Sequence, residues 1–497
     1  MAQVGTTGEE LGGAYLSALS AQVRARHGRH YTPVDLAEQL WAMTRRALGH
    51  GVVPRRLTGL VRDPACGAGA LLLPALREHL AALRRADPRM ILATLPSVIE
   101  GVDADPAAVW LANVVLAAEA LPVLAAVPSP GRRPLSLLAT CGDGLAPVGR
   151  LARAVVMNPP YGRVRLDPVE RKRFASFLYG HANLYGLFLA AGLESLDDQG
   201  ILSALVPTSF TAGRYFANLR GALAQNAPLR ELTFVADRDG VFSGVLQETC
   251  LATFTRRKPR KAAVYTSNGH VTPVASVPSP RDSGPWLLPR RADDAPVAAA
   301  AANMPLTLAD AGWRVSTGPL VWNRRRQDLH TMPGAGRFPV LWAADIDGGR
   351  LHRDSARDRL RYLRTRDDAD RLVMTLSEPA IVVQRTTAPE QARRIVAVEL
   401  SADDLADWGG RTVVENHVNV LRPTTTSPAL SRSALARLLA TPTLDRVMRC
   451  LAGSVAVSAY ELMSLPLPPA EELRTWESLR GDALDSAVRA AYQPGAV

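Results

Sequence analysis

Short apolar runs alternate with longer amphipathic stretches between about residue 60 and residue 254. The runs are bounded by Gly, Pro or Asp, and turn signals or helix starts follow them. Such alternation is typical of strand–helix–strand units, whose strands form a mostly parallel sheet. The predicted strands are residues 60–62, 97–102, 154–157, 201–206 and 231–235, and residues 248–254 are expected to close the sheet by hairpin-like pairing. The predicted fold class is therefore a doubly wound α/β sheet.

The pattern changes after residue 255. Residues 256–300 carry Ser-Pro and Arg-Asp pairs with little periodicity, and we interpret them as a connection between domains with room for a strand or two. Beyond it, strand-like pieces at 338–342, 380–384 and 418–421 mix with helical patterns at 431–439 and 444–451. A chain of 497 residues, 47% of them hydrophobic, can bury two cores. We therefore expect a second, mixed α+β domain over residues 301–497.

A glycine-rich turn follows the first predicted strand and opens a helix. Its residues are Asp63, Pro64, Ala65, Cys66, Gly67, Ala68 and Gly69. Glycines in such a turn allow a cofactor to approach the backbone at the N-terminus of a helix. A plain tight turn between strand and helix would look the same, so this turn alone does not define a cofactor site.

Acidic side chains follow the next two strand ends. Asp103 is placed to accept hydrogen bonds from both hydroxyls of a ribose, and Asp143 could accept one from the adenine amino group of a nucleoside cofactor. Upstream, Tyr31, Thr32 and Pro33 stand at the start of a helix. We predict that this start is also a lid segment over the bound donor.

The four residues after the strand at 154–157 are suited to bind an adenine that has been flipped out of the duplex: Asn158, Pro159, Pro160 and Tyr161. The N6 atom of adenine is a poor nucleophile because its lone pair is delocalised into the ring. The Asn158 side-chain oxygen and the Pro159 carbonyl can accept its two hydrogens and direct the lone pair toward a methyl donor. The Tyr161 ring would stack on the base.

Four segments in this order resemble the gamma-class adenine-N6 DNA methyltransferases of type II restriction-modification systems: residues 26–33, 63–69, 158–161 and 183–188. The resemblance covers the N-terminal half. It implies a Rossmann-like S-adenosylmethionine-dependent methyltransferase domain over residues 1–255, with an N-terminal helical lid over residues 1–58. S-adenosyl-L-methionine is then the cofactor, double-stranded DNA the acceptor, and protection of host DNA in restriction-modification or phage defence the biological role.

The same resemblance predicts a second aromatic on a later loop. Residues 241–247 match that loop, which makes Phe242 the candidate to complete the sandwich around the base, with a core aromatic as the alternative. One departure concerns the donor ring: relatives carry a bulky apolar residue directly after the third acidic position, where this chain has Gly144.

The polar and basic clusters of the second half resemble the target-recognition part of standalone members of that family. Arg, Asn and Gln read base edges, and Thr hydroxyls and Arg forks hold phosphates. The candidate DNA-binding residues are Arg324, Arg385, Thr386, Arg393, Asn416 and His417.

Composition changes this picture little. The net charge of +11 suits a polyanionic partner. Lysine, however, occurs only at Lys172, Lys258 and Lys261, so the arginine excess could equally reflect a GC-rich genome. The four cysteines lie far apart, which argues against a zinc site or a disulfide framework. We expect a cytoplasmic protein with no bound metal and no membrane partner; the apolar stretch 109–127 is interpreted as a buried helix and its exit loop.

Three other functions stay open. Glutamine- and RNA-modifying methyltransferases share the turn at 158–161, but they need no large reading domain. The chain could instead be the methyltransferase subunit of a larger defence complex that needs a separate specificity protein. It could also be a DNA-binding module without catalysis. A fused nuclease is disfavoured by the few residues before residue 26 and by the scarcity of lysine, so any restriction endonuclease would be a separate partner.

Overall fold

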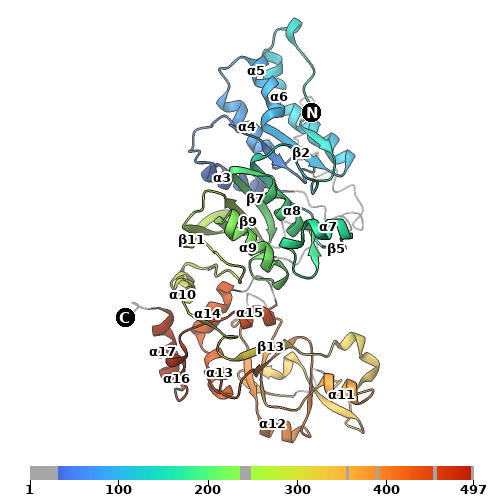
Figure 1. Cartoon of the computed structure of the whole chain (residues 1–497), viewed down its shortest axis with the longest axis vertical. Helices are drawn as coiled ribbons and strands as arrows, with labels where there is room; N and C mark the ends of the chain where they lie inside the picture. The colour runs from blue at the N-terminus through green and yellow to red at the C-terminus, as the bar shows by residue number, and fades with distance from the viewer. Residues whose placement is uncertain (1–31, 236–247, 354–357, 388–390, 452–455, 494–497) are drawn as a thin grey trace. The chain divides into compact units, whose positions relative to one another are not determined.

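The computed structural model describes residues 32–235, 248–353, 358–387, 391–451 and 456–493. The chain divides into two compact units (Figure 1). Unit 1 comprises Met1–Thr211 and Tyr215–Gly284, and unit 2 comprises Ala212–Arg214 and Pro285–Val497.

Unit 1 is built on one large sheet with the strand order β11-β10-β8-β9-β7-β4-β1-β2-β3. Strands β3, β2, β1, β4 and β7 run parallel to one another, as the α/β prediction requires. The strands are β1 (Val61–Asp63), β2 (Ile99–Asp103), β3 (Ala139–Cys141), β4 (Ala152–Met157), β7 (Leu196–Pro207), β8 (Leu229–Val235), β9 (Thr249–Thr255), β10 (Lys261–Asn268) and β11 (His270–Pro278). A short pair, β5 (Arg163–Val164) with β6 (Ala182–Asn183), lies apart from it.

Strand β9 lies between β7 and β8 and pairs antiparallel with both. Residues 248–254 were predicted to close the sheet by hairpin-like pairing; they do pair antiparallel with the preceding strand β8, but they lie inside the sheet and do not close it. The central strands are buried on both faces: every residue of β9 and all of 200–207 in β7 are buried. Strands covered on both faces read as continuous apolar runs, which is why the sequence predicted them well.

Helices cover both faces of this sheet. They are α3 (Val34–Leu48), α4 (Leu73–Ala82), α5 (Pro88–Val98), α6 (Pro106–Ala126), α7 (Pro168–Arg173), α8 (Leu184–Glu194) and α9 (Ala217–Asn226). Helices α3, α4 and α6 pack in series as one layer, and α8 with α9 forms another (Figure 1). The fold class is confirmed: a mixed α/β unit with a parallel central sheet.

Helix α6 is long and apolar enough to cross a membrane by length and composition alone. It packs on α4, α5, β2 and β3, and its residues Val109, Ala112 and Leu116 belong to the core of unit 1. The stretch predicted as a buried helix with an exit loop is thus a core helix that continues to Ala126.

Residues 256–300, interpreted as a connection, hold two strands of the main sheet. β10 pairs parallel with β8, and β11 pairs antiparallel with β10. β11 is an edge strand, carries Pro273 and is largely exposed, so its sequence gives a weak strand signal. The change from unit 1 to unit 2 falls at Gly284 and Pro285.

Unit 2 mixes small sheets with helices. One sheet has the order β13-β23-β20-β21 and another the order β14-β18-β15-β22-β19. The strands are β12 (Leu306–Thr307), β13 (Trp313–Thr317), β14 (Leu329–His330), β15 (Arg337–Leu341), β16 (Ile346–Asp347), β17 (Arg350–Leu351), β18 (Tyr362–Arg364), β19 (Thr375–Leu376), β20 (Ala380–Gln384), β21 (Ala397–Leu400), β22 (Thr412–Val414), β23 (Val418–Pro423) and β24 (Pro466–Leu467). Buried leucines and valines from β13, β20 and β23 form a core with helices from the end of the chain.

The helices of unit 2 follow their amphipathic patterns. They are α10 (Ala295–Ala301), α11 (Asp368–Met374), α12 (Ala402–Asp407), α13 (Arg432–Leu439), α14 (Pro442–Leu451), α15 (Ala459–Met463), α16 (Ala470–Thr475) and α17 (Gly481–Tyr492). The helices predicted at 431–439 and 444–451 correspond to α13 and α14. Ser431 begins α13, where its hydroxyl accepts a hydrogen bond from the Ala434 amide.

Candidate active site

Strand β4 carries the Asn158 side chain to the carboxyl edge of the sheet. Its residues 154–157 are buried, and the chain leaves the sheet directly after Met157. The Asn158 amide is held at both ends: Nδ2 donates to Thr32 Oγ1 at 3.0 Å, and Oδ1 accepts from the Tyr161 hydroxyl at 3.1 Å. The structure thus brings together Asn158, Tyr161 and Thr32, which the sequence analysis had assigned to two different pockets.

Tyr161 packs against the core of unit 1. Its hydroxyl also lies 3.2 Å from the Leu205 carbonyl of β7, and its ring meets Tyr185 edge-on, with centroids 6.0 Å apart. Burial raises the pKa of Tyr161 above its ordinary value, so the hydroxyl stays protonated and acts as a donor. Its role as a stacking platform for a base stays a prediction.

Tyr185 is a residue to which the sequence gave no role. It lies at the start of α8, 1% exposed, and its hydroxyl is 2.8 Å from Ser209 Oγ. Its ring stacks on Phe216 with centroids 4.9 Å apart. The aromatic and polar composition of residues 183–188 was the signal that could have pointed to it. Tyr185 supports the Tyr161 ring from the side of α8.

The glycine-rich turn after β1 is tied to the end of β2. Asp103 Oδ2 accepts from the Gly67 amide at 2.8 Å, and its Oδ1 accepts from the Asp105 amide at 2.9 Å. The Cys66 amide donates to the Val102 carbonyl at 2.9 Å. Gly67 and Gly69 adopt positive φ angles of 51° and 86°, a region that favours glycine. These bonds fix the predicted cofactor turn against Asp103.

Asp63 lies beneath this turn and is 1% exposed. Its Oδ1 accepts from the Ala65 amide at 3.0 Å. Burial raises the pKa of Asp63 to about 8, and the nearby Asp103 carboxylate acts in the same direction. At neutral pH, with nothing else bound beside it, Asp63 is mainly protonated.

The third acidic position lies after β3. Asp143 is exposed, and its Oδ1 accepts from the Leu145 amide at 2.9 Å. Next to it, a Cβ on Gly144 would lie 1.8 Å from the Pro64 carbonyl oxygen and 2.9 Å from the Phe188 ring. Glycine is therefore required here, because the backbone of the β1 turn occupies the space that a bulkier residue would need.

Two predicted site residues, Tyr31 and Phe242, lie outside the described residues, as do residues 26–30. Pro33 immediately precedes α3, and its carbonyl accepts from the Leu36 and Ala37 amides at 3.1 and 3.0 Å. The start of this helix is therefore placed as the sequence predicted.

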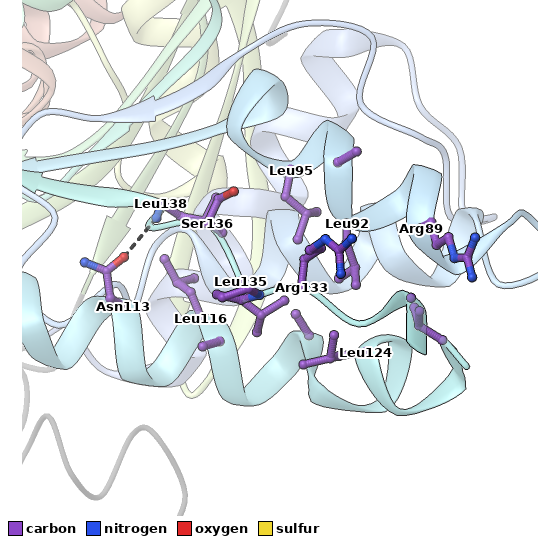
Figure 2. A pocket seen from close by; sticks show the side chains of 16 residues that line it. Arg89, Leu92, Leu95, Asn113, Leu116, Leu124, Arg133, Leu135, Ser136 and Leu138 are labelled. Atoms are coloured by element: carbon purple, nitrogen blue, oxygen red, sulfur yellow. Dashed lines mark hydrogen bonds between the residues drawn. The ribbon is translucent and has the colours of Figure 1, made fainter. Parts of the chain in front are cut away.

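A cavity of about 270 Å³ lies between α5 and α6 (Figure 2). Its wall includes Leu95, Leu124 and Leu138, and the Asn113 side chain beside it accepts from the Leu138 amide at 2.8 Å. Leu95 and Leu138 lie just before β2 and β3, whereas the predicted cofactor residues follow the strands. The cavity is thus at the opposite end of the strands from the candidate site.

In unit 2, four predicted DNA-binding residues lie together at the end of β20 and in the turn before β23: Arg385, Thr386, Asn416 and His417. We call them the β20 edge cluster. The Arg385 amide donates to the His417 carbonyl at 2.7 Å, and its guanidinium donates to the Asn416 carbonyl at 3.1 Å. Thr386 and His417 are exposed. Backbone carbonyls hold Arg385, and the His417 ring is paired with the buried Glu415 carboxylate, with Nδ1 2.6 Å from Oε1.

Arg324 and Arg393 differ in their surroundings. Arg324 is exposed and is the last residue of the short helix Trp322–Arg324. Just before this helix, the Leu320 carbonyl accepts a hydrogen bond from the Asn416 amide at 2.9 Å. The Arg393 guanidinium instead donates to the carbonyls of Leu439 and Thr441, at 3.5 and 3.1 Å, at the C-terminus of α13. Arg393 is therefore engaged in capping a helix.

Comparisons with known proteins identify one family model and several relatives. Residues 153–242 match the model of the Eco57I restriction-modification methylase family, a stretch that includes β4, Asn158, Tyr161 and β7. The type II methyltransferase M.BsuBI of Bacillus subtilis is 25% identical over 328 residues, 63% of this chain and 64% of that protein. The chain is similar to type II restriction-modification methylases.

M.PstI of Providencia stuartii, another type II methyltransferase, is 25% identical over 333 residues, 64% of this chain and 65% of that protein. The matches thus span slightly less than two thirds of these relatives' own length. The type IIL restriction-modification enzyme MmeI, solved in complex with DNA, shares the fold over 98% of this chain and 77% of its own, with a TM-score of 0.54 and 12% identity. The similarities to type II methyltransferases support S-adenosylmethionine as the cofactor.

Proposed function

We propose that this protein is a site-specific DNA adenine-N6 methyltransferase of a restriction-modification or phage defence system. The observation that carries the proposal is the Asn158 side chain after β4, held in one orientation by Thr32 and Tyr161. An amide oxygen held at the carboxyl edge of a parallel sheet is suited to accept a hydrogen from an exocyclic amino group. The similarity to type II methyltransferases supports the same reaction class.

The residues around β1 and β2 fit S-adenosylmethionine. Among the described residues, a Cβ on Gly67 would meet nothing within 4 Å, so these residues leave the space above this turn open to a ligand. Asp103 uses one lone pair of each oxygen on a backbone amide, which leaves further lone pairs for ribose hydroxyls. When bound, the cofactor supplies an electrophilic methyl group on a sulfonium. Asp63, Asp103 and Asp143 are the residues that would hold it.

The chain's own residues then prepare the acceptor. Asn158 Oδ1 and the Pro159 carbonyl each accept one N6 hydrogen of adenine, which localises the nitrogen lone pair for in-line attack. The Tyr161 hydroxyl must share Oδ1 with that hydrogen, because it already donates there. Tyr161, with Phe242 from the later loop, stacks on the extruded base and replaces its neighbours in the duplex. No general base is required before transfer, because the proton leaves from an already methylated, cationic nitrogen.

Unit 2 is proposed as the target-recognition domain, with residues 1–255 as the catalytic domain. The exposed side chains of Thr386, His417 and Arg324 are of the types that contact phosphates and base edges. The net charge of +11 favours a polyanion. The partner is double-stranded DNA, and a separate restriction endonuclease would cleave the unmodified sites.

The test is to express the chain in a host that lacks adenine methylation and to read modified bases across its genome by long-read sequencing. Asn158→Ala is the inactive control, and Asn226→Ala is the matched control. Asn226 is exposed on α9, and within the described part of the chain its side chain bonds only to the Ala222 carbonyl of its own helix, at 2.9 Å. N6-methyladenine at one short motif, present with Asn226→Ala and absent with Asn158→Ala, is the expected result. An unmodified genome with soluble, cofactor-binding protein would contradict a standalone enzyme.

A further inference from the structure

We propose that Thr32 is a positioning residue for methyl transfer, which fixes the orientation of the Asn158 amide. This inference rests on the function proposed above and adds to it a second role for a residue of the donor-side segment. The Thr32 hydroxyl is the partner of Asn158 Nδ2 at 3.0 Å, although the two residues are 126 positions apart in the chain.

The orientation of an amide side chain is set by its partners, because its oxygen and nitrogen ends have nearly the same shape. Thr32 accepts from Nδ2, and Tyr161 donates to Oδ1. One lone pair of Oδ1 then stays available for the N6 hydrogen of the substrate. Without the Thr32 hydroxyl, Tyr161 alone holds the amide, and its single hydroxyl hydrogen has a second acceptor in the Leu205 carbonyl at 3.2 Å. The amide can then rotate about its last bond and present its NH₂ end, which repels a hydrogen-bond donor.

Thr32 can serve as a fixed reference because the helix that follows it is anchored on the sheet. Thr32 is 6% exposed. Further along α3, the Thr44 hydroxyl is 2.8 Å from Ser203 Oγ of β7, which lies 3.0 Å from Thr253 Oγ1 of β9. All three hydroxyls are fully buried, so their mutual bonds resist displacement.

A second anchor acts on the same helix. The Trp41 indole donates to Glu78 Oε2 of α4 at 2.7 Å, and both residues are buried. The second half of α3 is therefore held by the sheet on one side and by α4 on another, which fixes the helix that follows Thr32. The position of Thr32, and with it the direction of the Asn158 oxygen, is determined by the packing of α3.

This arrangement predicts a specific kinetic signature. Removing the Thr32 hydroxyl leaves the Asn158 amide without a fixed orientation, so the methyl-transfer step slows. Binding of S-adenosylmethionine changes less, because it depends also on the residues around β1 and β2. Thr32→Val keeps the size and branching of the side chain and deletes only the hydroxyl. Thr32→Ser keeps the hydroxyl and deletes only the methyl group.

The experiment uses the full chain and measures single-turnover transfer of tritiated methyl from S-adenosylmethionine to plasmid DNA that lacks adenine methylation, together with cofactor affinity by calorimetry. Thr32→Val should lower the transfer rate about 10- to 100-fold at saturating cofactor, with cofactor affinity changed less than about threefold. Thr32→Ser should recover most of that loss. Thr94→Val is the matched control, since its hydroxyl bonds only within α5, to the Ile91 carbonyl at 2.8 Å.

A rate loss that saturating cofactor restores would overturn the proposal, because Thr32 would then act only on donor binding. So would a Thr32→Ser variant as slow as Thr32→Val. If the wild-type chain transfers no methyl to DNA, the proposed function fails, and a double-mutant cycle on stability tests the Thr32–Asn158 contact separately. The cycle compares the urea unfolding midpoints of Thr32→Val, Asn158→Ala and the double variant. If the shifts of the two single variants add up to that of the double variant, the two side chains are not coupled, which would overturn the proposal.

Discussion

The carboxyl end of β4 and the end of β20 both present polar side chains beyond a buried strand, but they are held in different ways. At β4, side chains hold side chains: Thr32 and Tyr161 bind the two ends of the Asn158 amide. At β20, backbone carbonyls of the turn before β23 accept the Arg385 bonds, Thr386 is exposed, and the exposed His417 is paired with the buried Glu415 carboxylate. The first arrangement depends on three particular side chains, whereas the Arg385 contacts in the second are made to backbone carbonyls that other residues at 416 and 417 would also present. Chemistry needs the former, and a recognition surface that varies between target sites needs the latter.

The largest effect is expected at Asn158. Asn158→Ala removes the acceptor for the N6 hydrogen and should lower methyl transfer at least about 1000-fold, as measured by tritium incorporation into DNA. The fold should be retained, because the side chain is only partly buried. A residual rate within tenfold of wild type would place the chemistry elsewhere.

A smaller but clear effect is expected at the donor turn. Gly144→Leu forces a Cβ against the Pro64 carbonyl and the Phe188 ring, so the β1 turn must shift. We expect cofactor affinity to fall at least about tenfold and stability to fall by about 1–3 kcal/mol, by calorimetry and urea unfolding. Gly149→Leu is the matched control, since a Cβ there meets nothing within 4 Å. Unchanged affinity in Gly144→Leu would show that the turn is pliable.

Within unit 2, two arginines separate a role in DNA binding from a role in stability. Arg324→Ala should weaken DNA binding about 5- to 10-fold and reduce the slope of log affinity against log salt by about one, without a change in stability. Arg393→Ala should instead lower stability by about 1 kcal/mol, because the Leu439 carbonyl at the end of α13 and the Thr441 carbonyl after it lose their donor. Fluorescence anisotropy measures DNA binding and urea unfolding measures stability. If Arg324→Ala lowered stability and Arg393→Ala weakened DNA binding, the assigned roles of the two residues would be wrong.

A further effect concerns pH and Asp63. The folded-state pKa of about 8 lies above that of an unfolded aspartate, so the protonated carboxyl contributes stability that is complete at low pH and is lost as pH rises toward 8. The loss is at most about 1.4 kcal/mol per pH unit. Urea unfolding of the cofactor-free protein between pH 6 and 8 should show it, and Asp63→Asn should flatten the dependence. The same slope in both proteins would assign the effect to another group.

The sequence predicted the parts of the molecule whose structure follows from local chemistry. Strands β4 and β7 are apolar runs buried on both faces, and the turn at Asn158 has a rigid, recognisable composition. β10 and β11 were predicted only as a strand or two within a connection, because half-exposed strands with a proline at the sheet edge give little hydrophobic signal. The Thr32–Asn158 contact depends on the docking of α3. Arg324 and Arg393 look alike in sequence and differ only in what surrounds them.

The place of β9 in the sheet bears on how the protein is made. β7 is flanked by β4 on one side and by β9 on the other, yet β9 is synthesised more than forty residues after β7 ends. Until Thr255 has left the ribosome, a nascent chain exposes one edge of an apolar strand that is buried in the mature molecule. Such an edge is a template for aggregation. Truncated messages that stop between β7 and β9 should therefore yield insoluble products, whereas translation past β9 marks the point at which the exposed edge of β7 can be covered.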